Sequence, residues 1–432
     1  MRLAALFVLL LAGPAPAQPL LPHTLSLPVS SRKPARQITL SLPPDLTVNL
    51  AATGLHCPRF FALSPDHRIF VADLYNRSDN SKGALYILDG WNPATQSFST
   101  VIPYLKNLRN PNNLAFYTDP TGQSWLYTAL TDRLIRFRYN FGDTHPSSPP
   151  EILARYPDYG LSYKYGGWHL TRTVAFAQLH GVTRLYVTVG SSCNACQEKE
   201  PVRASLTVMD PDGRNGHILA SGLRNAVDLR YLPDVDRGAL FATNMGADHL
   251  GPHSPEDTFL ELDSNARPGP ANDPAKPASF GWPTCYSLGG LPHPDPSVSH
   301  PQPGQHILNA HPGPPPPQMD CKQVAPPYTT IPAHSSPLGL EYFAADNKLL
   351  AGSFLVALHG PSHPRIGTGY RVVQFSPADR RPRDLMLGFL AEESGRTLVK
   401  GRPCGILRTG PDSFLLSDDL NGVVYFIHPT KS

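Results

Sequence analysis

Charged residues are scarce in this chain of 432 residues. Asp, Glu, Lys and Arg together make up 16% of it, against about a quarter in an average soluble domain. The formal net charge is +3 with histidine neutral, which gives no electrostatic reason to expect a nucleic-acid partner. The sequence also lacks Gly-x-Ser-x-Gly, His-Glu-x-x-His, a phosphate-binding loop and a dinucleotide-binding glycine fingerprint. Any chemistry must therefore rest on polar residues outside these motifs.

A long apolar run occurs only at the N-terminus. Arg2 precedes an apolar stretch over 3–11, and the small residues of 15–17 offer a cleavage site. This pattern predicts a secretory signal peptide over 1–17, which is too short to span a membrane stably. No later stretch stays apolar long enough to cross a membrane. We therefore expect a secreted, extracellular protein whose mature part, 18–432, has no membrane segment.

The chain has six cysteines, which in a secreted protein predict disulfides. No second cysteine pair or histidine set stands at zinc spacing from Cys193-x-x-Cys196. This pair is therefore interpreted as a structural disulfide rather than as half of a zinc site. Asn76-Arg77-Ser78 matches the N-glycosylation motif, which is either an acceptor site or a chance occurrence.

Proline (49 residues) and glycine (34 residues) are abundant, which disfavours long helices and suits short strands joined by turns. One pattern recurs six times: an apolar strand, a turn, a second strand and a third strand with alternating side chains. The repeats begin near Cys57, Pro111, Arg172, Arg224, Ser336 and Pro403. A unit this small cannot bury both of its faces alone. We therefore predict an all-β fold, a six-bladed β-propeller that forms a single domain.

Two strands, over 38–42 and 47–50, precede the first repeat and are expected to complete the last blade. Such closure would bring the first and last repeats together. Cys57 and Cys404 occupy similar places in those two repeats. We therefore expect a Cys57–Cys404 disulfide that locks the ring.

A long irregular stretch, at about 263–334, separates the fourth repeat from the fifth. It is too long for an ordinary loop, so we expect a functional loop or a lobe that covers the rim. Cys285 and Cys321 both lie in it and are expected to pair with each other.

Polar residues stand where the innermost strand of each repeat begins. They are Arg59, Asn112, Asn113, His169, Arg172, Arg224, Asn225, His334 and Arg402. Innermost strands face the central channel of a propeller, so these side chains are expected to meet at one mouth. Clustered Arg, His and Asn make a pocket for an anion.

Several segments together carry a family resemblance. They are LYVTVGSSCN from Leu185, SGLRN from Ser221, GWPTCY from Gly281, VALHG from Val356 and GRPCG from Gly401. With these motifs the chain resembles the soluble quinoprotein sugar dehydrogenases of the glucose/sorbosone group, and most of all the fungal pyranose dehydrogenase domains that use pyrroloquinoline quinone (PQQ). The resemblance runs from about residue 57 to residue 427, nearly the whole mature chain.

The resemblance implies roles for particular residues. His169 stands where the family has the base that takes the sugar hydroxyl proton. Arg224 and Asn225 match the pair that grips the quinone. The residues matching those that hold cofactor carboxylates are Arg59, His359 and Arg402. The carbonyls of Gly246 and Ala247 match the calcium ligands, and Asp257 matches the acidic residue that supports them.

The chain departs from the bacterial glucose dehydrogenases at three places. His359 replaces a lysine, and Cys404 replaces a second arginine. Ser191-Ser192 stands where those enzymes have an aspartate that orients the base. These departures fit the sorbosone/pyranose branch and argue against glucose as the substrate.

The resemblance thus implies a secreted oxidoreductase that transfers hydride from a sugar, a pyranose or a 2-keto-aldose, to PQQ in the presence of calcium. No haem-binding Cys-x-x-Cys-His is present, so electrons are expected to pass to a separate acceptor, a cytochrome or another redox protein. A monomer is expected. The alternatives are a calcium-dependent, lactonase-type propeller hydrolase and a binding propeller without catalysis. The first needs acidic residues along the axis, where this chain has mainly basic ones.

Overall fold

A computed structural model of the protein describes residues 23–29, 36–157, 169–179, 181–235, 238–262, 277–299, 319–344, 348–362 and 368–430. The predicted signal peptide, 1–17, lies outside these ranges. No helix in the described part of the chain is long and apolar enough to cross a membrane.

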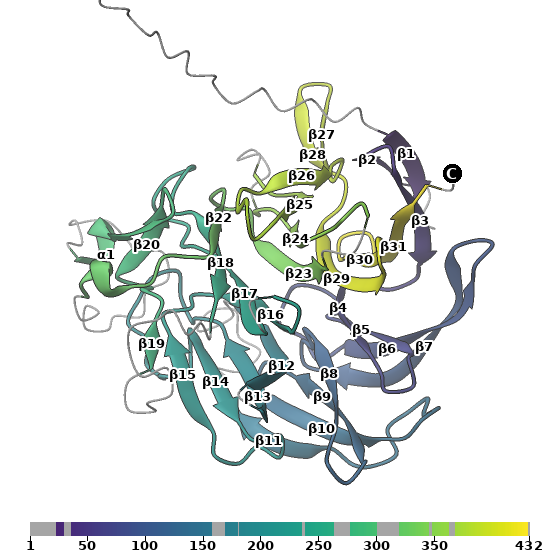
Figure 1. Ribbon diagram of the computed structural model, residues 1–432, viewed down its shortest axis with the longest axis horizontal. Helices are drawn as coiled ribbons and strands as arrows, with labels where there is room; N and C mark the ends of the chain where they lie inside the picture. The colour runs from purple at the N-terminus through teal and green to yellow at the C-terminus, as the bar shows by residue number, and fades with distance from the viewer. Residues whose placement is uncertain are drawn as a thin grey trace, which may run out of the picture.

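Six sheets stand around one axis as the blades of a propeller, which confirms the predicted fold (Figure 1). Each blade has four antiparallel strands, and the innermost strands of neighbouring blades lie against one another around the axis. From the innermost strand outward, blade 1 consists of β4 (Pro58–Leu63), β5 (Ile69–Asp73), β6 (Gly83–Asn92) and β7 (Ser97–Leu108). Blade 2 consists of β8 (Leu114–Thr118), β9 (Ser124–Ala129), β10 (Arg133–Tyr139) and β11 (Glu151–Arg155). Blade 3 consists of β12 (Arg172–Leu179), β13 (Val182–Val189), β14 (Ser205–Met209) and β15 (His217–Ser221). Blade 4 consists of β16 (Ala226–Leu232), β17 (Ala239–Asn244), β18 (Asp257–Glu261) and β22 (Thr329–Ile331). Blade 5 consists of β23 (Pro337–Phe343), β24 (Ser353–Leu358), β25 (Arg371–Phe375) and β26 (Arg383–Met386). Blade 6 consists of β29 (Pro403–Gly410), β30 (Ser413–Asp418), β31 (Val423–Pro429) and β3 (Leu46–Ala52).

Apolar side chains from adjacent blades bury one another, which is why a lone repeat would be unstable. Between blades 4 and 5, for example, the ring centroids of Phe241 and Phe354 lie 5.1 Å apart, as do those of Phe259 and Phe375. Aromatic pairs at this spacing stabilise the contact beyond the area they bury. The β-rich, aromatic segments of the repeats therefore become the layers of the core.

The predicted closure of the ring is correct for one of the two N-terminal strands. β3 is the outer strand of blade 6 and pairs with β31 from the other end of the chain. The earlier strand, β2 (Gln37–Leu42), instead pairs with β1 (His23–Pro28). It touches the edge of blade 5 through a single bridge between Ser41 and Leu387.

The predicted Cys57–Cys404 disulfide is wrong, since both cysteines are free and buried. The register explains the error. Pro58 pairs with Asp73, and Pro403 pairs with Asp418, so the two prolines are the equivalent positions. Cys57 precedes its proline whereas Cys404 follows its own, which puts the two cysteines at different levels along the axis.

The described parts of the stretch 263–334 are more ordered than the sequence suggested. They contribute β22 to blade 4 and the short β19 (Ala278–Ser279) beside β15. The remainder forms a lobe with the hairpin β20 (Cys285–Leu288) and β21 (Leu291–Pro294), the helix α1 (Pro296–Ser299) and the 3-10 turn η1 (Cys321–Gln323). The predicted Cys285–Cys321 disulfide is confirmed and ties the lobe together. A second hairpin, β27 (Leu390–Glu393) with β28 (Arg396–Val399), projects from the ring (Figure 1).

Side chains on the innermost strands, or just before them, pack against one another around the axis. We call this group the plug. It comprises Arg59, Phe60, Asn112, Thr173, Val227, Leu338 and Cys404. Asn112 links the polar side chains of the plug, because it accepts from Arg59 Nε at 3.2 Å and donates to Thr173 Oγ1 at 2.8 Å. The plug separates a cavity at one end of the axis from another at the opposite end.

Candidate active site

A cavity of about 230 Å³ lies at the end of the axis where the innermost strands begin. We call it the axial cavity. The predicted site residues that line it are Arg59, His169, Asn225, His359 and Arg402. Arg77, Met245 and Ser336 are among the other lining residues. The structure therefore brings together residues from five blades that the sequence separates by more than three hundred positions.

His169 precedes β12 in a left-handed conformation, with φ of 49°. Its Nδ1 lies 2.8 Å from Ser191 Oγ and 3.2 Å from the Ser191 carbonyl oxygen. A carbonyl oxygen can only accept, so Nδ1 carries the proton and Nε2 carries the lone pair. Burial, reinforced by the charge of Arg224, holds the pKa of His169 well below its ordinary value. At neutral pH the ring is therefore an uncharged base.

Asn225 lies beside His169, and a glycine makes this approach possible. A Cβ on Gly190 would stand 2.5 Å from His169 Cβ and 2.7 Å from Asn225 Oδ1. The buried Asn225 Oδ1 has no hydrogen-bond partner in the described part of the protein. Buried polar atoms usually have partners, so an atom left over in a cavity indicates a ligand.

The opposite wall of the axial cavity is a network around Asp419. This carboxylate accepts from Arg59 Nη1 at 2.8 Å and from His359 Nε2 at 2.9 Å. His359 Nδ1 in turn lies 3.2 Å from Arg402 Nη1, which can only donate, so His359 carries its proton on Nε2. Burial lowers the pKa of His359 to about 4 despite its contact with Asp419. His359 is thus a neutral link between Arg402 and Asp419.

Arg402 is held mainly by backbone carbonyls. Nη1 donates to Gly360 O at 2.8 Å, and Nη2 donates to Pro361 O at 2.9 Å. Nη2 also lies 3.2 Å from the hydroxyl of Tyr370. Arg402 therefore contributes positive charge to the cavity from a fixed position.

Arg77 is a member of the site that the sequence patterns did not reveal. It lines the axial cavity and is exposed, and it makes no hydrogen bond or ion pair with other described residues. Arg77 follows β5, the second strand of blade 1, whereas Asp419 follows β30, the second strand of blade 6. Loops after second strands reach the same face as the starts of first strands, and that rule would have found both residues.

Arg224 lies in an adjoining pocket of about 60 Å³ rather than in the lining of the axial cavity. Its Nε donates to Asn194 O at 2.9 Å, Nη1 to Gly246 O at 2.7 Å and Nη2 to Asp248 Oδ2 at 2.8 Å. Asp248 also faces His334, with 3.6 Å between the two side chains. Although burial acts to raise it, the contacts with His334 and Arg224 hold the pKa of Asp248 well below its usual range.

The residues predicted to hold calcium lie next to this pocket. Gly246 and Ala247 follow β17, and both line it. Asp257 is buried and accepts from the N–H groups of Gly246 (2.7 Å) and Ser336 (2.8 Å). Burial, partly offset by these two hydrogen bonds, raises the pKa of Asp257 to about 7. Asp257 therefore fixes the backbone at Gly246, and its two oxygens are occupied by backbone donors.

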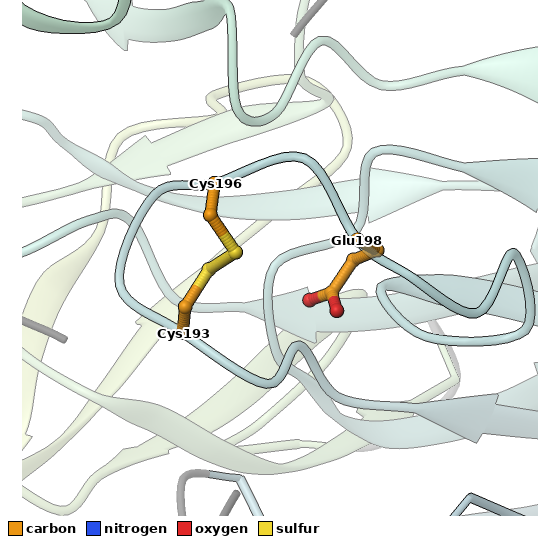
Figure 2. Close-up of side chains that lie close together, drawn as sticks. All are labelled: Cys193, Cys196 and Glu198. Carbon is orange, nitrogen blue, oxygen red and sulfur yellow. A yellow bond between two sulfur atoms is a disulfide. The ribbon is translucent and has the colours of Figure 1, made fainter. Parts of the chain in front are cut away.

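Cys193, Cys196 and Glu198 lie close enough together to resemble a metal site (Figure 2). The two sulfurs are joined in the predicted disulfide, however, so neither is available as a thiolate ligand. The Glu198 carboxylate instead accepts from Ser192 N at 2.7 Å and Ser192 Oγ at 2.6 Å. These residues form a structural loop beside His169.

The remaining predicted residues hold the mouth in shape. Asn113 accepts from Val174 N at 2.9 Å and so joins blades 2 and 3. Arg172 donates to the His169 carbonyl at 2.7 Å and fixes the backbone there. His334 lies 2.7 Å from the Gly251 carbonyl.

A family model described as TrAA12-like matches residues 40–386. The chain belongs to the TrAA12-like family. No curated protein sequence matches the chain. The match ends before blade 6, so the family model covers neither Arg402 nor Asp419 of this TrAA12-like protein.

Solved structures share the fold. The PQQ domain of pyranose dehydrogenase from Coprinopsis cinerea, in its holo form, superposes with a TM-score of 0.64 at 17% identity, covering 90% of this chain and 97% of that one. A calcium structure of an AA12 enzyme from Trichoderma reesei gives 0.64 at 15% identity, with 90% and 96% covered. PQQ-bound aldose sugar dehydrogenase from Streptomyces coelicolor gives 0.54 at 17% identity, with 90% and 100% covered. The resemblance inferred from the motifs is therefore confirmed.

Proposed function

We propose that this protein is a PQQ-dependent sugar dehydrogenase that oxidises a pyranose or a 2-keto-aldose. The observation that carries the proposal is His169, a buried neutral imidazole held with its proton on Nδ1 at the wall of a cavity rich in arginine. Membership of the TrAA12-like family and the shared fold with PQQ-bound sugar dehydrogenases support it.

His169 acts as the general base in this proposal. Nε2 accepts the proton of the sugar hydroxyl as hydride leaves the adjacent carbon. The chemistry supplied by the bound quinone is that of a hydride acceptor. Proton acceptance must come from a group that is uncharged at working pH, and burial keeps His169 in that form.

The axial cavity fits a quinone that carries three carboxylates. Arg59, Arg77 and Arg402 place positive charge along one wall, and guanidinium groups bind carboxylates well. Arg77 has its donors available in the described structure, and the Asn225 side-chain amide offers a polar group without a partner. These residues would hold the cofactor, with Arg224 acting from the neighbouring pocket.

We propose calcium as the accompanying ion, which would polarise a carbonyl of the quinone. The donors fit it in part. Ala247 supplies a backbone carbonyl, and calcium prefers such oxygens. The Gly246 carbonyl accepts from Arg224 Nη1 at 2.7 Å, which leaves one of its two lone pairs for an ion. The T. reesei relative has a calcium structure, which is a further reason to test for the ion.

We also propose secretion, N-glycosylation at Asn76 and transfer of electrons to a separate redox protein. Two disulfides are typical of an oxidising compartment. Asn76 is exposed, as an acceptor site requires. A lactonase-type hydrolase has no support at the axis, because Asp419 is engaged by Arg59 and His359.

Reconstitution of the purified protein tests the function. PQQ and calcium are added, and reduction of an artificial electron acceptor is followed with a panel of pyranoses and 2-keto-aldoses. We expect acceptor reduction that requires both sugar and quinone. Absence of sugar-dependent reduction across the panel, with quinone demonstrably bound, would refute the proposed activity.

The calcium proposal is tested separately by titrating PQQ in calcium and in excess chelator. We expect tighter binding in calcium, because the ion adds a ligand to the quinone oxygens. Equal affinity in the two titrations would show that calcium has no part in cofactor binding.

A further inference from the structure

The loop after β13 is fixed at both of its ends. The Cys193–Cys196 disulfide closes it across three residues (Figure 2). Glu198 accepts two hydrogen bonds from Ser192, and burial raises the pKa of Glu198. Ser191 is fully buried, and its N–H donates to the Arg224 carbonyl at 2.8 Å. Nothing in the family resemblance assigned a role to this disulfide.

The carbonyl of Cys193 decides which way Ser191 donates. Ser191 Oγ lies 2.7 Å from Cys193 O, which can only accept, so the single hydroxyl proton points there. The same Oγ must therefore accept from His169 Nδ1, 2.8 Å away. A disulfide cysteine thus orients the serine hydroxyl that accepts from the proposed base, beside the Ser191 carbonyl that accepts from the same nitrogen.

The next residue of the loop holds Arg224. Asn194 O accepts from Arg224 Nε at 2.9 Å, and Asn194 Oδ1 accepts from Arg224 Nη2 at 2.9 Å. Asn194 O also accepts from Trp282 Nε1 at 3.0 Å, and Asn194 Oδ1 from Asp248 N at 2.8 Å. One short loop therefore holds both His169 and Arg224.

We infer that the Cys193–Cys196 loop is the positioning device of this site, with Ser191 as the positioning residue for His169 and Asn194 as that for Arg224. This inference rests on the proposed function where it concerns turnover. The hydrogen-bond chain itself is a property of the protein without cofactor. The loop takes over, with a serine and a backbone carbonyl, the orienting role that an aspartate has in the bacterial enzymes.

The tautomer of His169 is the first test. The protein is labelled with ¹⁵N-histidine, and the His169 ring signals are assigned by their loss in His169→Gln. We expect the wild-type ring to be protonated on Nδ1. In Ser191→Ala only the backbone carbonyl of residue 191 remains as acceptor, so we expect part of the population to move to the other tautomer. Ser124→Ala is the matched control, because Ser124 is a buried serine of β9 whose hydroxyl contacts Thr118 and not His169. A wild-type ring protonated on Nε2 overturns the inference, whether or not any sugar is oxidised.

Kinetics give the second test. Ser191→Ala should lower kcat about tenfold with KM within about twofold, as expected for loss of one oriented hydrogen bond. Ser124→Ala, outside the site, should leave kcat within about twofold of wild type. The double variant Cys193→Ser/Cys196→Ser should lower kcat and also weaken PQQ binding, because Asn194 loses its fixed position. Wild-type kcat and PQQ affinity in a folded double variant would overturn the role of the loop, while leaving the proposed sugar oxidation intact.

Discussion

The two ends of the propeller axis carry similar residues and differ in how these residues are paired. The cavity opposite the axial cavity is larger, about 490 Å³, and also contains arginines and carboxylates. There, Arg230 donates to Glu341 and to Ile406 O, and Glu341 also accepts from Arg408 N at 3.0 Å. The charges of Arg230 and Glu341 are thus satisfied within the protein.

The axial cavity is smaller, but it contains polar groups that lack a partner among the described residues. Arg77 has no ion pair within the described residues, and Asn225 Oδ1 has no hydrogen-bond partner there. The difference arises because strand residues with tight turns line the far cavity, whereas the loops after second strands reach the axial one. Unpaired polar groups therefore identify the site better than cavity size does.

His169→Ala should have the largest effect. Turnover should fall by about 10²–10⁴, the usual contribution of a positioned base, while the fold and PQQ affinity are retained. In the wild type the rate should rise with pH as the imidazolium loses its proton. Because the pKa of His169 is lowered, this rise should lie below pH 6.5. Steady-state rates against pH check both points, and survival of the acid limb in His169→Ala would place the base elsewhere.

Arg224→Ala should weaken PQQ binding by about 1.5–3 kcal/mol, the range for a hydrogen bond to a charged group. Arg230→Ala at the far end is the comparison, and its PQQ affinity should match that of the wild type. Isothermal titration gives the affinities, and thermal unfolding confirms that each variant is folded. Equal losses in the two variants would erase the distinction between the two ends.

Arg77→Ala should weaken PQQ binding by a smaller amount, about 0.5–1.5 kcal/mol, because its side chain is exposed. Arg408→Ala is the matched control from the far cavity. The same titration distinguishes them. Unchanged affinity in Arg77→Ala would remove this residue from the cofactor wall.

Titration of His359 should make the free energy of unfolding of the protein depend on pH. The pKa of His359 is about 4 in the folded protein, below its ordinary value of 6.5. The unfolded chain therefore binds this proton more readily between these values, so His359 contributes a fall in the free energy of unfolding as pH decreases from 6.5 to 4. Asp257, whose pKa is raised to about 7, contributes a rise over the same range. Denaturant titrations at several pH values check this. His359→Gln should flatten the slope, and an unaltered slope would assign the effect to other groups.

Much of the fold was predictable because the repeats carry it. Alternating apolar residues and turn signals recur in each unit, so the number of blades and their closure through β3 followed from the sequence. The pairing of β2 with β1 did not, because β2 has the same strand pattern as a blade strand. The Cys57–Cys404 disulfide was predicted because the two cysteines were aligned with each other. The strand register instead aligns Pro58 with Pro403, since these are the positions that pair with Asp73 and Asp418.

The candidate site was predictable where motifs mark the first strands. His169, Asn225 and Arg402 all reach the axial cavity as expected. Arg77 and Asp419 were missed because only the starts of first strands were expected at the mouth, whereas the loops after second strands reach the same face. That Ser191 contacts His169 depends on the folding of the loop to Cys196, which spacing alone does not specify.

The pairing of β3 with β31 has a consequence for how the protein is made. His428 and Asn49, which contact each other across these strands, are 379 residues apart in the sequence. As the polypeptide emerges, β3 must therefore wait as an open edge until the last blade is synthesised. An open edge invites pairing with other chains, and so long a loop is slow to close. The ring is thus most vulnerable to aggregation before its final strand is delivered, and we expect assistance from chaperones at that stage.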